Sequence, residues 1–254
     1  MLHWIERGVR LVLRVRSARL IVYVEKRLGK FGAPYDDLPI LPRSKEEVSR
    51  DFVFAQPGER LRFLDVGACD GALTYLLGIS GNLDYSDADY SAALARFRAK
   101  YEYFGMDLRE LGHEKVLVGD ICAADYLDRH APFRASFDVI YSNNVFEHLR
   151  KPWVAAKNIL ELLKPGGLGI VIAPFAQRYH RVPEDYFRYT HVGLRTLFED
   201  VGTIDVLVCA YDLMGRRNDW QGSGEVSDIV PEDRFGAWRE TWFTMLVFRK
   251  CAPA

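Results

Sequence analysis

The sequence predicts a doubly wound α/β domain, with helices on both faces of a mostly parallel, seven-stranded sheet whose last strand is antiparallel. Two observations predict it. From residue 61 onward, short apolar runs of the buried-strand type alternate with stretches of helical periodicity, as strand–helix–strand units do. The last two apolar runs are separated by residues 213–240, which show no long helical pattern, so the final strands are expected to be antiparallel neighbours.

The composition is that of a globular protein and narrows the choice of partners. The chain has 254 residues, 49% hydrophobic and 27% charged, which is enough for one large buried core. Lys and Arg number 34 against 35 Asp and Glu, so no overall field attracts nucleic acid. The cysteines form no CxxC pair, which favours reduced thiols and a cytoplasmic location over a zinc or disulfide framework.

Residues 1–43 are predicted to be a basic helical extension and a connector. Residues 1–30 contain eight Lys and Arg residues but only two acidic residues, Glu6 and Glu25. Apolar residues lie between them at helical spacing. Two interpretations remain open. This segment packs on the main domain as a flanking helix, or residues 1–28 lie on an anionic membrane surface and make the protein a peripheral membrane protein.

The helices and strands of residues 44–254 are predicted from hydrophobic periodicity and from stop signals. A capping-box spacing between Ser44 and Glu47 starts a short helix. Strands are predicted at residues 61–66, 82–91, 115–120, 137–143, 168–174, 203–213 and 242–250. Helices are predicted at residues 72–78, 92–105 (ending at Gly105), 152–167 and 191–202.

The turn after the first predicted strand, RFLDVGACDG at residues 62–71, is the strongest functional signal. In such sheets ligands bind beyond the carboxyl ends of the strands, where the strand order reverses. A dinucleotide loop would read GxGxxG and offer a bare helix N-terminus to a pyrophosphate, which Asp65 and Asp70 would repel. A ligand without phosphate and with a positive centre, such as S-adenosylmethionine, fits the acidic turn better.

Several motifs in order resemble the class I S-adenosylmethionine-dependent methyltransferases, which have a Rossmann-like fold. LDVGACDG, residues 64–71, resembles the family's DxGxGxG motif, with Cys69 in place of the middle glycine. ILELLKPGG, residues 159–167, resembles the segment before the family's fifth strand. The resemblance covers roughly residues 60–200, the core of the domain, and implies S-adenosylmethionine as cofactor. PEDYFRYT, residues 183–190, resembles methyltransferase-like proteins of bacterial surface-polysaccharide clusters.

The resemblance also implies the residues of the cofactor side. Asp89 would end the second strand and hold the ribose hydroxyls, Asp120 would meet the adenine amine, and Ile121 would pack on the adenine ring. The loop after residues 137–143 would lie against the methionine end. The full predicted set is Asp65, Gly67, Ala68, Gly71, Asp89, Tyr90, Asp120, Ile121 and Asn143.

The acceptor side is predicted from two stretches that follow strands. A hydroxyl acceptor benefits from a nearby base, and His148 and His180 are the favoured candidates. Asp185 is in reserve, as base or as the group that orients His180. Residues 175–191 are expected to form a lid whose tyrosines contact the acceptor; in the other interpretation they cover the core while Asp185 and Arg188 form an i,i+3 pair. Residues 213–240 are expected to form either a second cover over the cleft or an exposed loop.

Together these observations predict an enzyme that transfers a methyl group to a hydroxyl, or another nucleophile, of a small-molecule or carbohydrate acceptor in surface-glycan biosynthesis. The alternative is a non-catalytic cofactor-binding or scaffold protein that keeps the fold, which the Cys69 departure leaves open. A nicotinamide-dependent oxidoreductase is disfavoured by the acidic turn. No nucleic-acid partner is expected, because the charges balance. No metal is expected either, because no tight cluster of Asp, Glu and His stands out along the sequence.

Overall fold

The computed structural model of the chain describes residues 38–69, 73–77, 87–110, 112, 115–177, 179–181, 184–212 and 242–252. Chain contacts divide it into two units, Met1–Leu38 and Pro39–Ala254, and the second unit holds every described helix and strand. Two predicted features lie outside the described residues: the basic segment of residues 1–28 and the loop of residues 213–240. Among the described helices, none combines the length and the apolar character needed to cross a membrane.

One sheet organises the described residues. Its strands are β1 (Leu61–Val66), β2 (Tyr101–Asp107), β3 (Val116–Val118), β4 (Phe137–Asn143), β5 (Leu163–Ala176), β6 (Ile204–Asp212) and β7 (Trp242–Lys250). The helices are α3 (Lys45–Phe54), α4 (Thr74–Leu77), α5 (Asp87–Lys100), α6 (Tyr126–Arg129), α7 (Pro152–Leu162) and α8 (His191–Glu199), with 3₁₀ turns η1 (Ala131–Phe133) and η2 (Phe146–His148).

The strand order β3-β2-β1-β4-β5-β7-β6 confirms the predicted fold class. Strands β1 to β5 pair in parallel, and β7 is inserted antiparallel between β5 and β6. The chain moves outward from β1 through β2 to β3 and then returns to place β4 on the other side of β1. The order therefore reverses between β1 and β4, the place at which open α/β sheets bind their ligands.

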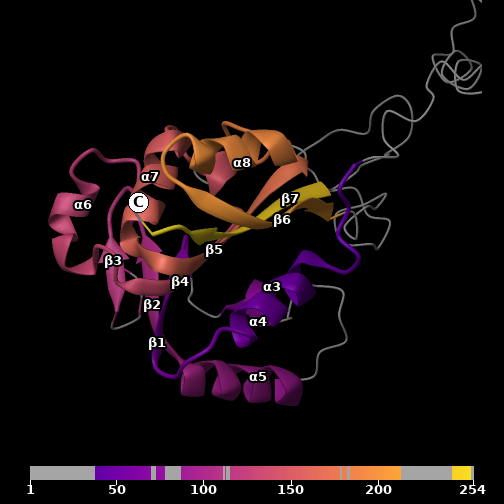
Figure 1. Ribbon diagram of the computed structural model, residues 1–254, viewed down its shortest axis with the longest axis vertical. Helices are drawn as coiled ribbons and strands as arrows, with labels where there is room; N and C mark the ends of the chain where they lie inside the picture. The colour runs from indigo at the N-terminus through magenta and orange to yellow at the C-terminus, as the bar shows by residue number, and fades with distance from the viewer. Residues whose placement is uncertain are drawn as a thin grey trace, which may run out of the picture. The chain divides into compact units, whose positions relative to one another are not determined.

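Helices cover both faces of the sheet (Figure 1). Helices α6, α7 and α8 pack on one face, and α3, α4 and α5 pack on the other. Each face has its own apolar core, as the doubly wound pattern requires. The first core includes Phe104, Phe137, Ile159, Leu194 and Phe248. The second includes Val48, Phe63, Leu76, Phe97 and Met245.

Helix α3 begins where the sequence predicts. The Ser44 hydroxyl accepts from the backbone N–H of Glu47, and the Glu47 carboxylate accepts from the backbone N–H of Ser44, which completes the capping box. The connector before it already belongs to this unit, because Leu41 is buried and its N–H donates to the Tyr211 carbonyl at 2.8 Å.

The predicted second strand is wrong. The described part of residues 82–91 is the start of helix α5, and the predicted helix of residues 92–105 ends at Lys100 rather than at Gly105. Strand β2 follows without a turn and pairs with β1 in parallel, with Val66 opposite Met106. The aromatic and apolar side chains of residues 101–106 supply the sheet face, which outweighs the helical spacing that runs into them.

Two further boundaries differ from the prediction. Helix α7 ends at Leu162, and β5 begins at once with Leu163, so the strand is longer than the predicted residues 168–174. The early pairing of Leu163 with Phe137 extends β5 backwards, and the Lys164 ammonium lies 2.7 Å from the Asp138 carboxylate of β4. Helix α6 was not predicted.

We expect Gly169→Ala to lower the free energy of unfolding by about 1–3 kcal/mol, the usual cost of overpacking a core. A Cβ at Gly169 would lie 2.2 Å from the Phe248 ring on the neighbouring strand β7. Urea denaturation measures the change. Gly112→Ala is the matched control, because a Cβ there meets nothing within 4 Å. Equal stability of the two variants would contradict the packing of β5 on β7.

Candidate active site

The turn after β1 and the loop after β4 meet at the reversal point of the sheet. Gly67 has a φ of +77°, a conformation that favours glycine. A Cβ at this position would lie 2.4 Å from the Cγ2 atom of Val145, two residues before Glu147. The two loops are therefore in direct contact, and only glycine fits between them.

The glycine turn is fastened to the end of β2. The N–H groups of Gly67 and Ala68 donate to the Met106 carbonyl at 2.8 and 3.1 Å. The N–H of Cys69 points at the Asp107 carboxylate, with 3.3 Å between nitrogen and Oδ2. Cys69 has a φ of +54°, so this residue adopts a left-handed conformation at the place where the family motif has glycine.

Asp107 therefore stands where the sequence placed Asp89. Asp107 is the last residue of β2, and its carboxylate lies against the turn after β1. Asp89 is exposed and lies in the first turn of α5, and Tyr90 follows it on the same helix, packed partly on the second core. The premise that Asp89 ends the second strand is wrong.

The other predicted cofactor residues lie in different surroundings. Asp65 is buried at the end of β1, and the Tyr103 hydroxyl donates to its carboxylate at 3.2 Å. Asp120 is exposed after β3 and accepts from the N–H of Cys122 at 2.8 Å. Ile121 lies within the first core. Gly71 falls outside the described residues.

Asn143 ends β4 beside the glycine turn and carries an unsatisfied amide. Both its Oδ1 and Nδ2 atoms are buried, and no described residue gives either atom a hydrogen bond. Buried polar atoms of this kind are uncommon and are explained by a ligand, a water or strain. The position and chemistry of this side chain suit the polar end of a ligand.

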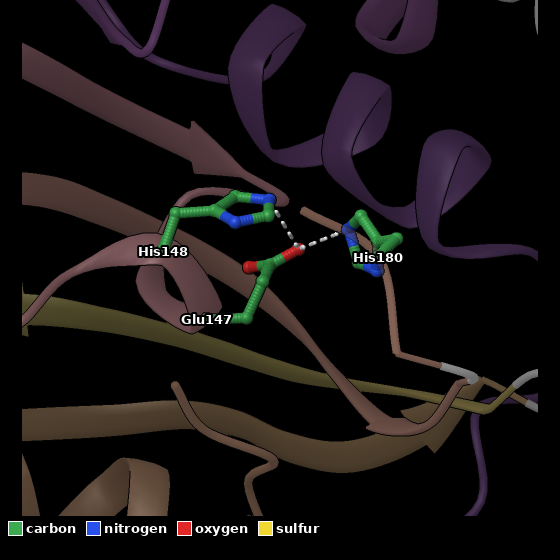
Figure 2. Close-up of side chains that lie close together, drawn as sticks. All are labelled: Glu147, His148 and His180. Atoms are coloured by element: carbon green, nitrogen blue, oxygen red, sulfur yellow. Dashed lines mark ion pairs between the residues drawn. The ribbon is translucent and has the colours of Figure 1, made fainter. Parts of the chain in front are cut away.

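Beyond the ends of β4 and β5, three side chains converge from two loops (Figure 2). Glu147 and His148 come from η2, after β4, and His180 comes from the segment after β5. The Glu147 Oε1 atom lies 3.7 Å from His148 Nε2 and 4.0 Å from His180 Nε2. The two imidazole rings stand perpendicular, with centroids 4.9 Å apart. We call these three residues the Glu147 cluster.

His148 is held by a backbone carbonyl. Its Nδ1 lies 2.6 Å from the Glu184 oxygen, so a neutral ring donates from Nδ1 and keeps its Nε2 lone pair toward Glu147. Burial lowers the pKa of His148, and the neighbouring His180 lowers it further, while the contact with Glu184 acts in the opposite direction. The neutral ring is thus favoured at neutral pH.

Asp185 contacts His180 and is paired with Arg188. Its carboxylate accepts from the His180 backbone N–H at 2.8 Å, faces His180 Nδ1 at 3.5 Å, and forms an ion pair with Arg188. Burial would raise the pKa of Asp185, but the hydrogen bonds from Arg188 and His180 outweigh it and hold that pKa below its ordinary value. A carboxylate so stabilised is a poor proton acceptor.

Glu147 is the least ordinary group in the cluster. Its side chain is 0% exposed, and neither carboxylate oxygen has a hydrogen-bond partner in another described residue. Burial raises the pKa of Glu147 to about 7, although its own backbone N–H and the Arg188 charge partly offset this. Glu147 is not among the residues predicted for the site, and nothing in the local sequence pattern shows that it is buried.

Residues 184–190 cover the core, as one of the two interpretations of the lid predicts, while two tyrosines of the lid stay partly exposed. The Tyr186 N–H donates to the Glu147 carbonyl at 2.7 Å, and the Tyr189 hydroxyl donates to the Phe146 carbonyl at 2.9 Å. Tyr189 is buried in the first core, as the covering interpretation predicts. Tyr179 and Tyr186 are about half exposed (55% and 48%), so their rings remain accessible to an acceptor.

The chain was compared with families, curated proteins and solved structures. No curated protein matches the chain in sequence. Among solved structures it is similar to the YcgJ protein of Bacillus subtilis (12% identical, covering 82% of this chain and 100% of that chain, TM-score 0.49). It is also similar to the cyclase SpnF, with 16% identity over 82% of this chain and 82% of that chain and a TM-score of 0.48. A third similar structure is a SAM-dependent methyltransferase of Aquifex aeolicus, with 16% identity over 80% of this chain and 89% of that chain and a TM-score of 0.44. Residues 64–171, from β1 into β5, match the methyltransferase domain family, and this match supports a methyltransferase.

Proposed function

We propose that the protein transfers a methyl group from S-adenosylmethionine to a hydroxyl of a small-molecule or carbohydrate acceptor, in the assembly of a surface glycan. One observation carries the proposal. The contact between Gly67 and Val145 joins an acidic glycine turn to the loop that presents the Glu147 cluster, so a cofactor region and a reactive region share one edge of the sheet.

The residues at this edge fit S-adenosylmethionine. Asp107 offers a carboxylate for the ribose hydroxyls, in the place that Asp89 was predicted to take. The buried Asn143 amide offers a donor and an acceptor for the methionine end. Asp65 adds negative charge near the turn, which suits a cationic ligand and disfavours a pyrophosphate. When bound, the cofactor supplies an electrophilic methyl group.

The Glu147 cluster suits the acceptor side. A hydroxyl loses its proton when it takes a methyl group, and His148 and His180 both direct Nε2 toward the centre of the cluster. The exposed rings of Tyr179 and Tyr186, near the charged pair of Asp185 and Arg188, suit a sugar ring. The chain's part is to align the acceptor and to draw off its proton.

Asp107→Asn should weaken S-adenosylmethionine binding by about 1.5–3 kcal/mol, because the ribose hydroxyls lose a charged acceptor. The matched variant Asp89→Asn should leave the affinity unchanged, since Asp89 is exposed on α5. Isothermal titration calorimetry on the full chain measures both. A loss confined to Asp89→Asn would show that the cofactor does not bind along the end of β2.

His148→Ala and His180→Ala should each lower turnover by about 10²–10⁴-fold at saturating cofactor, the usual contribution of proton transfer, while cofactor affinity stays the same. His191→Ala is the control, because that ring packs against Tyr211 at the start of α8. Turnover is read by mass spectrometry as the gain of one methyl group across nucleotide sugars, glycans and lipids. Cofactor binding without methylation of any acceptor in the panel would favour the non-catalytic alternative.

A further inference from the structure

We propose that Glu147, His148 and His180 bind one divalent transition-metal ion. Each residue directs one ligand atom to a common centre, and these atoms all lie within 4.8 Å of one another (Figure 2). Two imidazoles and one carboxylate are a donor set that zinc and iron(II) sites use. The sequence did not predict a metal, because the ligands come from loops after two different strands.

The distances suit ligands of one ion better than direct contacts. The Oε1–Nε2 separations of 3.7 and 4.0 Å exceed those of hydrogen bonds. Two atoms that each lie about 2.0–2.1 Å from one ion are at most about 4.2 Å apart. Both separations fall below that limit, so an ion fits between Glu147 and either histidine. The three ligand atoms lie within 4.8 Å of one another, so binding one ion requires the two imidazoles to stand no more than about 4.2 Å apart at their ligand atoms, which a small rotation of either ring achieves.

The Glu147 carboxylate supplies a second, independent observation. It is fully buried, it faces both rings, and neither oxygen receives a hydrogen bond from another described residue. A buried carboxylate in this state loses its hydration, and its own backbone N–H and the Arg188 charge offset that loss only in part. A bound cation would restore the missing interactions, and buried charges in proteins are paired or coordinate metals.

Each histidine has a polar partner on its second ring nitrogen, as histidines that bind metals do. A metal-bound imidazole donates its other N–H to a carbonyl or a carboxylate, which fixes the ring and the tautomer. His148 Nδ1 lies 2.6 Å from the Glu184 carbonyl, and His180 Nδ1 lies 3.5 Å from the Asp185 carboxylate. Both Nε2 atoms are thereby presented to Glu147. Arg188 holds Asp185 in place through two nitrogens.

The donor set also decides the kind of metal. Imidazole suits zinc, iron, copper and nickel, whereas magnesium and calcium prefer oxygen ligands. Three protein ligands leave at least one position open, which is typical of catalytic rather than structural sites. We therefore expect zinc or iron(II), with an open position toward the acceptor side.

An ion here gives the cluster a chemical role, and this step rests on the proposed methyl transfer. A divalent ion lowers the pKa of an oxygen that binds it, so an acceptor hydroxyl at the open position would release its proton to solvent. With the ion bound, His148 and His180 would act as its ligands in place of the proton-accepting role described above. The new oxygen–carbon bond then forms as the sulfur–carbon bond breaks, and the bonding electron pair stays on sulfur.

The test uses the untagged full chain, because a histidine tag would bind metal by itself. The chain is stripped with a chelator and titrated with zinc ions alone by calorimetry, with the bound zinc counted by elemental mass spectrometry. We expect one equivalent to bind. Glu147→Gln and His180→Ala should each weaken zinc binding by at least about 100-fold. Asp185→Asn should weaken it by about 10–100-fold, because Asp185 contacts a ligand and not the ion itself.

His191→Ala is the matched control and should bind zinc as the unaltered chain does, and magnesium should not displace the zinc. Circular dichroism checks that each variant is folded, and Glu147→Gln keeps the shape of the side chain should a histidine variant fail. Absence of one-to-one binding, or equal affinity in Glu147→Gln and the unaltered chain, overturns the proposal. Cofactor binding by the stripped chain, measured in parallel, reports on the proposed function separately.

Discussion

The close approach of two loops at Gly67 is the constraint on which the site depends. A side chain there would strike Val145, so glycine lets the end of β1 and the loop after β4 touch. That contact sets the position of η2 relative to the glycine turn and hence the position of Glu147 and His148. The reversal of strand order puts these loops side by side, and the missing Cβ lets them close.

The second support is the ion pair between Asp185 and Arg188. Arg188 also donates to the carbonyls of Gln177 and Phe187, so its guanidinium joins the start of the lid to residues 184–190 within it. The pair is partly buried, and such pairs fix geometry more reliably than they add stability. Here the geometry is that of His180, whose backbone and ring both face Asp185.

Much of the fold could be predicted from the sequence, because β1, β4 and β7 are short apolar runs with clear ends. The failure at β2 has a physical cause: helix α5 passes into the strand between Lys100 and Tyr101 with no glycine or proline to mark the change. That error placed the predicted ribose-binding acid at Asp89, in α5, whereas the acid that ends β2 is Asp107. The pair of Asp185 and Arg188 was predictable because i,i+3 spacing is local.

The Glu147 cluster was beyond prediction, since its geometry comes from contacts between distant segments. The sequence offered His148 and His180 as separate bases; the tertiary fold aims both at one carboxylate. This bears on the alternative of a non-catalytic scaffold, which Cys69 in its left-handed conformation had left open. A protein that only kept the fold would gain nothing from burying, between two imidazoles, a carboxylate to which no other described residue donates a hydrogen bond. Functional sites carry such local conflicts because a ligand resolves them. The buried Glu147 therefore favours chemistry at this edge.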